Sequence, residues 1–165
     1  NATSKEIQDA LLVERKRNAQ VHCTVWHADR CTDMLFHIEP QWFIPTSDGS
    51  QGGCDAKWGQ WYLAPDKSAE GLIEPPDEIK ALLSTFDKMT EVVDENERVK
   101  LGQSIFDWLA ENPLQIGLVL ECPAPLLFNK NMRNLPRPKA YIGWDSYGLS
   151  TYHPCAFFYE GGVRA

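Results

Sequence analysis

Residues 75–113 read PPDEIKALLSTFDKMTEVVDENERVKLGQSIFDWLAENP and contain the clearest helical pattern in the chain. Apolar residues three and four positions apart predict an amphipathic helix opened by Pro76 and Asp77. Its apolar positions are Ile79, Leu82, Leu83, Phe86, Met89 and Val93. Asp94, followed three residues later by Glu97, resembles a capping box and predicts the start of a second helix. The apolar positions of that helix are Leu101, Ile105, Trp108 and Leu109. The second stripe ends before Pro113, so we expect the two helices to pack as a hairpin.

Three apolar runs outside this hairpin have the length and composition of strands. Leu114–Leu120 is almost continuously apolar, which predicts a strand covered on both faces by helices. Val21–Trp26 is rich in β-branched and aromatic residues and predicts a strand that ends near Asp29. A short strand over 126–128 should precede a turn at 129–131. The pattern therefore predicts an α/β or α+β fold.

The remaining segments are less regular. Residues 4–19 should form a helix with a basic last turn, while frequent glycine and proline predict that 30–74 is mostly loop. Large rings in that loop either anchor it on a core or line a ligand cleft. These rings are Phe36, Trp42, Phe43, Trp58, Trp61 and Tyr62. The tail from residue 134 should cross irregularly and end in an edge strand or docked segment near 156–159.

The overall composition excludes several classes of protein. A chain of 165 residues has the size of one domain, and its net charge of -7 disfavours binding to nucleic acid or anionic lipid. No apolar run approaches the length that spans a bilayer. The five cysteines form no CxxC pair, which argues against a paired-cysteine zinc site and leaves the disulfide state open.

The sequence offers little support for a metal centre or a catalytic nucleophile. Cys23, His27 and Cys31 lie four residues apart, which in a strand separates neighbouring members by roughly 13 Å and is too far for one metal ion. The chain contains no nucleophile elbow, no HExxH motif and no phosphate-binding glycine loop. We therefore expect a protein that is not an enzyme and needs no cofactor.

Trp26 and Asp29 are the strongest candidates for a binding site. They lie at the C-terminal end of a predicted strand, where open α/β sheets present their ligand sites. A ring and a fixed carboxylate suit an ammonium group, or a sugar that stacks on the ring. The alternative is that Trp26 fills the core and Asp29 caps the following turn.

The order of several motifs resembles the C-terminal part of family 5 extracellular solute-binding proteins. The motifs are ERxRNAxVHxxxWHAD at 14–29, an aromatic loop, the two helices of 75–113, and IGLVLECPAPLLFNKNMRNLP at 116–136. The resemblance covers about Glu14 to Tyr159. It implies one α/β lobe of a type II periplasmic-binding-protein-like fold, with helices on a mixed sheet and an irregular C-terminal tail.

The resemblance also implies a domain organisation and a function. Residues 1–2 have, independently of the resemblance, the composition expected of a cloning scar. Residues 3–130 would be part of a second lobe, and 131–165 a tail that returns to a first lobe missing from this chain. Such proteins capture oligopeptides or oligosaccharides outside the cytoplasm for the permease subunits of ABC importers. They are periplasmic or extracellular, and some are lipid-anchored. In peptide-binding relatives the positions of Trp26 and Asp29 face the ligand.

The ligand class stays open between peptide and sugar. The long loop after Asp29 departs from the usual peptide-binding pattern, and its Trp42, Trp58 and Trp61 are candidates to stack on sugar faces. One alternative function is a carbohydrate-active hydrolase that uses paired carboxylates such as Asp29 and Asp33 near this loop. Another is a protein-interaction module whose aromatic patch meets a partner chain.

Overall fold

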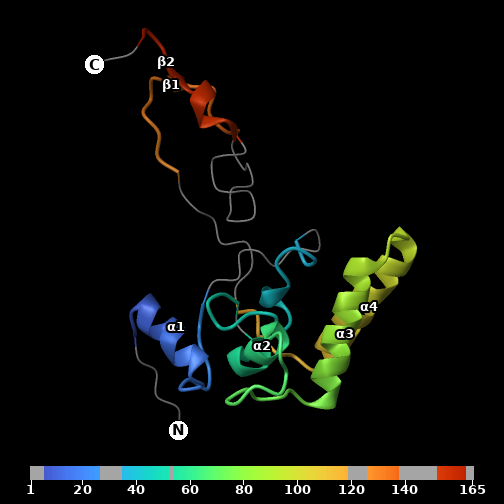
Figure 1. The fold of residues 1–165 in the computed structure, drawn as a ribbon. Helices are drawn as coiled ribbons and strands as arrows, with labels where there is room; N and C mark the ends of the chain where they lie inside the picture. The colour runs from blue at the N-terminus through green and yellow to red at the C-terminus, as the bar shows by residue number, and fades with distance from the viewer. Residues whose placement is uncertain (1–5, 27–34, 53, 119–125, 138–151, 163–165) are drawn as a thin grey trace. The chain divides into compact units, whose positions relative to one another are not determined.

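The computed structural model describes residues 6–26, 35–52, 54–118, 126–137 and 152–162. The chain divides into two compact units, residues 1–116 and 117–165. The first unit is helical and the second contains a small sheet (Figure 1). The helices are α1 (Asp9–Arg17), α2 (Ala56–Leu63), α3 (Asp77–Glu91) and α4 (Glu95–Glu111); the strands are β1 (Met132–Arg133) and β2 (Phe158–Tyr159). The described chain is therefore mixed α and β, with helix predominating.

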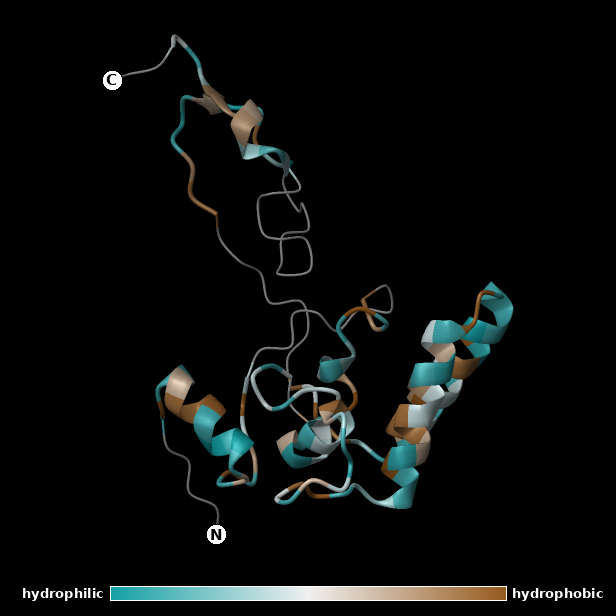
Figure 2. Ribbon diagram, in the orientation of Figure 1, coloured by the Kyte–Doolittle hydropathy of each residue, from teal (hydrophilic) through white to brown (hydrophobic). Residues whose placement is uncertain are grey.

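The α3–α4 pair confirms the predicted helical hairpin. The two helices pack against each other along their lengths, and Asp94 caps α4 by accepting a hydrogen bond from the Glu97 N–H at 2.8 Å. Apolar residues recur along both helices between hydrophilic stretches (Figure 2). The predicted stripe is buried as far as Met89, whereas Val93 is 93% exposed because α3 ends at Glu91.

The core of the first unit lies between this hairpin and residues 36–44. Its buried members are Phe36, Ile44, Ile79, Leu82, Leu83, Phe86, Met89 and Ile105. The centre of the Phe36 ring lies 5.1 Å from the ring centre of Phe43, 5.6 Å from that of Phe86 and 4.8 Å from that of Phe106. These contacts show that rings of the irregular segment anchor it on the helices.

Helix α2 lies within the segment that the sequence predicted as mostly loop. Asp55 caps the helix by accepting hydrogen bonds from the N–H groups of Lys57 at 2.8 Å and Trp58 at 3.3 Å. Gly59, which weakens the helical pattern, is needed because an added Cβ there would lie 1.8 Å from the Ser47 carbonyl oxygen. The missing side chain lets α2 pack directly on the preceding loop.

Helix α1 is shorter than predicted and buries none of its residues. It ends at Arg17, and Ala19 adopts a left-handed conformation with φ of 53°, which is incompatible with continuing the helix. The predicted basic last turn is present and holds the helix in place. Lys16 Nζ donates to the Gly52 carbonyl at 2.8 Å, and Arg17 pairs with Asp48 at 2.7 Å.

The predicted strands of the first unit are wrong in the residues that the structure describes. Residues 21–26 and 114–118 form neither strand nor helix, and the described part contains no sheet of helix-covered strands. The short strand expected over 126–128 is also absent; β1 follows the turn instead. A strand needs a partner for its backbone groups, and these apolar runs do not pair with one another.

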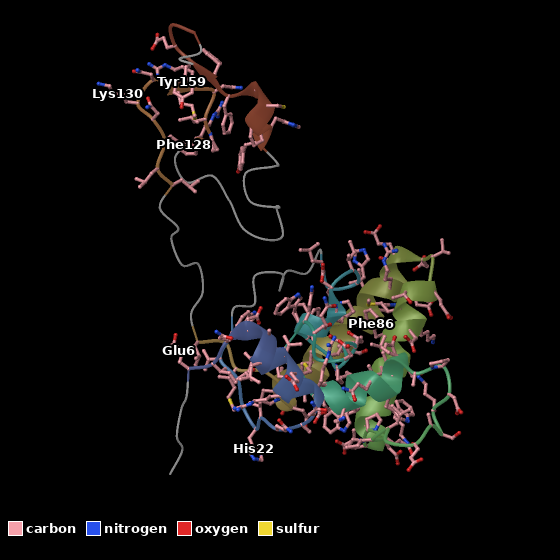
Figure 3. The ribbon with its side chains drawn as sticks, turned by 60° about the vertical axis from the view of Figure 1, so that its left-hand side comes forward. Glu6, His22, Phe86, Phe128, Lys130 and Tyr159 are labelled. Carbon is pink, nitrogen blue, oxygen red and sulfur yellow. The ribbon has the colours of Figure 1, made fainter. Side chains whose placement is uncertain are left out.

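The second unit is built around an antiparallel ribbon. Met132 pairs with Tyr159 and Arg133 with Phe158, which confirms an edge strand near the end of the tail. Arg133 also forms an ion pair with Glu160. Phe128 and Tyr159 both lie in this unit (Figure 3). None of the residues described in this unit is buried.

Candidate functional site

Trp26 is accessible in the structure, as a ligand-contacting ring must be. Its side chain is 50% exposed and the preceding Val25 is 79% exposed, so the prediction that Trp26 fills the core is wrong. His22, at the start of the same segment, points outward (Figure 3). Asp29 and Asp33 lie outside the described residues, so the pairing of Trp26 with Asp29 and the two-carboxylate site stay predictions.

Trp42 lies on the short 3-10 turn Pro40–Trp42 and is only 7% exposed. This burial contradicts its predicted role as a sugar-stacking surface. The turn is followed by Phe43, which packs against the core, and by Ile44, which is fully buried in it. Trp42 therefore belongs to the structural anchor of the irregular segment.

The two remaining candidate tryptophans, Trp58 and Trp61, both lie on α2 but make different contacts. Trp58 and Trp61 lie three residues apart and so project from neighbouring positions of the helix. Trp58 is half-buried and packs against the core of the first unit. Trp61, in the last turn, is also half-buried, but its ring meets a charged side chain.

That charged side chain is Lys67, which folds back onto the end of α2. Its ammonium nitrogen lies 5.0 Å from the centre of the Trp61 ring and 5.7 Å from that of Tyr62. The same nitrogen donates to the Trp61 carbonyl at 2.9 Å and to the Tyr62 carbonyl. Two rings and two carbonyl oxygens thus surround one cation.

Tyr62 also connects α2 to α3. Its hydroxyl donates a hydrogen bond to the Asp87 carboxylate, and its ring packs against the core. Burial, followed by the hydrogen bond and negative charge of Asp87, raises the pKa of Tyr62 above its ordinary value. The phenol therefore stays neutral and keeps its ring in place beside Lys67.

A second polar junction surrounds Cys54. The thiol donates to the Phe43 carbonyl at 3.4 Å, and Gln115 Nε2 donates to the sulfur at 3.3 Å. Lys16 lies near enough for its charge to interact with Cys54, although burial is the main influence and lowers the pKa of Lys16. The junction brings Cys54 together with Phe43, Gln115 and Lys16, so its polar contacts connect four segments of the first unit.

Sequence reasoning missed Lys67, Asp87 and the helical placement of Trp61. The Asp55 cap followed by an apolar-aromatic stretch was a usable signal for α2, but Gly59 and the nearby glycines concealed it. Nothing in the spacing of Trp61 and Lys67 indicated that the lysine returns to the helix. That contact depends on the path of 64–66, which only the tertiary structure shows.

Comparison with known proteins adds no relative. No protein-family model matches the chain, and no match was found among the curated proteins or the solved structures. Among the described helices, none combines the length and the apolar character needed to cross a membrane. Within the same residues, no three histidine, cysteine or acidic side chains gather as metal ligands do.

Proposed function

We propose that the chain is a ligand-binding part of the substrate-binding component of an ABC importer. It captures an oligopeptide outside the cytoplasm and delivers it to the permease subunits in the membrane. The resemblance of residues 14–159 to family 5 solute-binding proteins supplies the class of protein and its location. The observation that carries the ligand class is the stretch 21–25, which forms no backbone-to-backbone hydrogen bond within the described residues and leads to the half-exposed ring of Trp26.

Residues 21–25 have the composition of a strand but belong to no sheet of the described part of the chain. Within the described residues, no backbone-to-backbone hydrogen bond involves residues 21–25. We propose that their backbone groups pair with an added chain, as happens when an extended peptide joins an exposed strand. The half-exposed ring of Trp26 supports binding of a ligand side chain at the end of the segment.

The placement of the other tryptophans favours peptide over sugar. Trp42 is buried, Trp58 packs on the core, and Lys67 lies over the ring of Trp61. A row of accessible rings, which was the reason to consider oligosaccharides, is therefore missing among these three. Peptide binding needs no such row, because main-chain hydrogen bonds supply much of the affinity.

Exposed apolar side chains support the presence of a further lobe in the functional protein. In the first unit Ile116 is 81% exposed, and in the second Leu127 is 96% and Phe158 57% exposed. Apolar surface of this kind marks sites that another chain segment or partner covers. We propose that a first lobe of the same protein is that partner. Binding then involves hydrogen bonding and desolvation and breaks no bond.

Calorimetric titration of the chain with short oligopeptides and, separately, with oligosaccharides tests the proposal. We expect saturable heat with peptides alone. Replacing Trp26 with alanine should weaken peptide binding by about tenfold or more, as for the loss of an aromatic anchor. The matched control is Leu63→Ala, which truncates a 55% exposed side chain on α2 and should leave affinity unchanged. Binding of sugars only, or equal affinity in the Trp26→Ala variant, would contradict the proposal.

A further inference from the structure

The C-terminal end of α2 has the chemistry of a binding site for an ammonium group. Trp61 and Tyr62 each contribute a ring face and a carbonyl oxygen, and all four groups lie around a single nitrogen. We call these four groups the ammonium cradle. Both ring centres are within the range of about 6 Å over which the negative face of an aromatic ring attracts a cation.

The helix itself adds to this preference for positive charge. The last carbonyls of a helix have no amide partner in the next turn and form the negative end of its dipole. Trp61 O accepts one backbone N–H, from Ala64 at 3.3 Å, and still accepts from Lys67. A neutral or anionic group placed in the cradle would gain neither the dipole nor the ring attraction.

We propose that the ammonium cradle is a binding site for the primary ammonium group of a cationic ligand, and that Lys67 occupies it as an internal ligand. The Lys67 side chain is exposed and belongs to the exposed stretch 65–71, so an incoming ligand can reach and displace it. Tyr62 keeps its position during the exchange because its hydroxyl is bonded to Asp87 and its ring packs on the core.

This site is separate from the one proposed for peptide capture. It uses Trp61 and Tyr62 on α2, whereas peptide capture uses the segment that ends at Trp26. An ammonium group can come from a lysine side chain or from the amino terminus of a peptide, and the cradle chemistry suits both. The two proposals can fail independently, because their variants and their probes differ.

The experiment removes the internal ligand and supplies a free one. Lys67→Met keeps an apolar stem of similar length but has no charge. Lys57→Met is the matched control because Lys57 lies on α2, and its Nζ bonds to Gln60 Oε1 at 3.1 Å. The probes are n-butylammonium and N-acetyl-lysine methylamide for the side-chain source and alanine amide for the terminal source, with n-butanol as the uncharged control. The readout is the NMR shift of the Trp61 indole N–H at constant ionic strength.

We expect each effective ammonium probe to shift this resonance saturably in Lys67→Met. In the unmodified chain and in Lys57→Met, the probe concentration that gives half of the maximal shift should be at least about tenfold higher. The reason is that the tethered Lys67 competes with the probe at high effective concentration. Comparing the side-chain and terminal probes identifies the source that the site accepts. The double variant Lys67→Met/Trp61→Leu should show no saturable shift. Because this variant lacks the Trp61 indole, the Trp58 indole N–H is monitored instead.

Three results would overturn the proposal. The first is a Lys67→Met chain in which no ammonium probe gives saturation, or in which n-butanol acts equally well. The second is an equal half-saturating probe concentration in the unmodified chain and in Lys67→Met. The third is loss of helical circular dichroism in both Lys67→Met and Lys67→Gln, since Lys67 would then be a structural cap of α2 and not a replaceable ligand.

Discussion

Replacing Gly59 with alanine should destabilise the first unit, although alanine is the better helix former. The interior of α2 approaches the loop before it so closely that the new Cβ would lie 1.8 Å from the Ser47 carbonyl oxygen and 2.6 Å from its carbon. Non-bonded heavy atoms pack at about 3.5 Å, so the helix and the loop must separate by about 1.7 Å. The obstructing atoms are backbone, which cannot rotate away.

The size of the effect follows from two opposing contributions. Alanine in a helix interior is about 1 kcal/mol more favourable than glycine. Inserting a group into a packed interface costs about 1–3 kcal/mol and more when backbone must move. We therefore expect a net loss of about 2 kcal/mol in the free energy of unfolding, which is about a 30-fold change in the ratio of folded to unfolded chain.

Gly102 provides a matched control inside α4. It is also a buried helical glycine, but its added Cβ would meet only the Met89 sulfur, at 3.4 Å. Gly102→Ala should therefore be neutral or stabilise the chain by up to about 1 kcal/mol. Urea unfolding followed by circular dichroism measures both variants. A Gly59→Ala chain as stable as the unmodified one would refute the close packing of α2 on Ser47.

Two further changes test individual interactions. Asp94→Ala should lower the free energy of unfolding by about 1 kcal/mol, because the cap bond to the Glu97 N–H is lost. Glu95→Ala is the control in the same turn. Equal urea midpoints for the two variants would count against the cap. Because burial and Asp87 raise the pKa of Tyr62, the folded chain favours the neutral phenol, and this stabilisation is complete below the unfolded pKa of about 10 and declines above it. Urea unfolding from about pH 8 to 11 should therefore show a steeper loss of stability above about pH 10 than in Tyr62→Phe; identical pH profiles would contradict the assignment.

The hairpin of α3 and α4 could be predicted because its information is local. Apolar spacing, the Asp94 cap and the flanking prolines act within one or two turns, and each was present in residues 75–113. The basic last turn of α1 was predictable for the same reason. Helix ends were less certain: α1 stops where Ala19 turns left-handed, which its composition did not indicate.

The candidate site depended more on distant contacts. The aromatic content of residues 36–62 indicated that rings would anchor a loop or face a ligand, but it did not assign a role to each ring. Packing assigned them: Trp42 entered the interior, Trp58 contacted the core, and Trp61 received Lys67. These roles depend on which segments meet in space, and spacing along the chain carries no such information.

The strand predictions failed for a related physical reason. Strand composition in 21–26 and 114–118 expresses a preference for extended backbone, but a strand forms only when another segment completes its hydrogen bonds. A helix satisfies its backbone groups internally, so periodicity was sufficient to specify the hairpin. Pairing, burial of individual rings and the return of Lys67 to α2 are properties of the folded arrangement, and only the tertiary structure decided them.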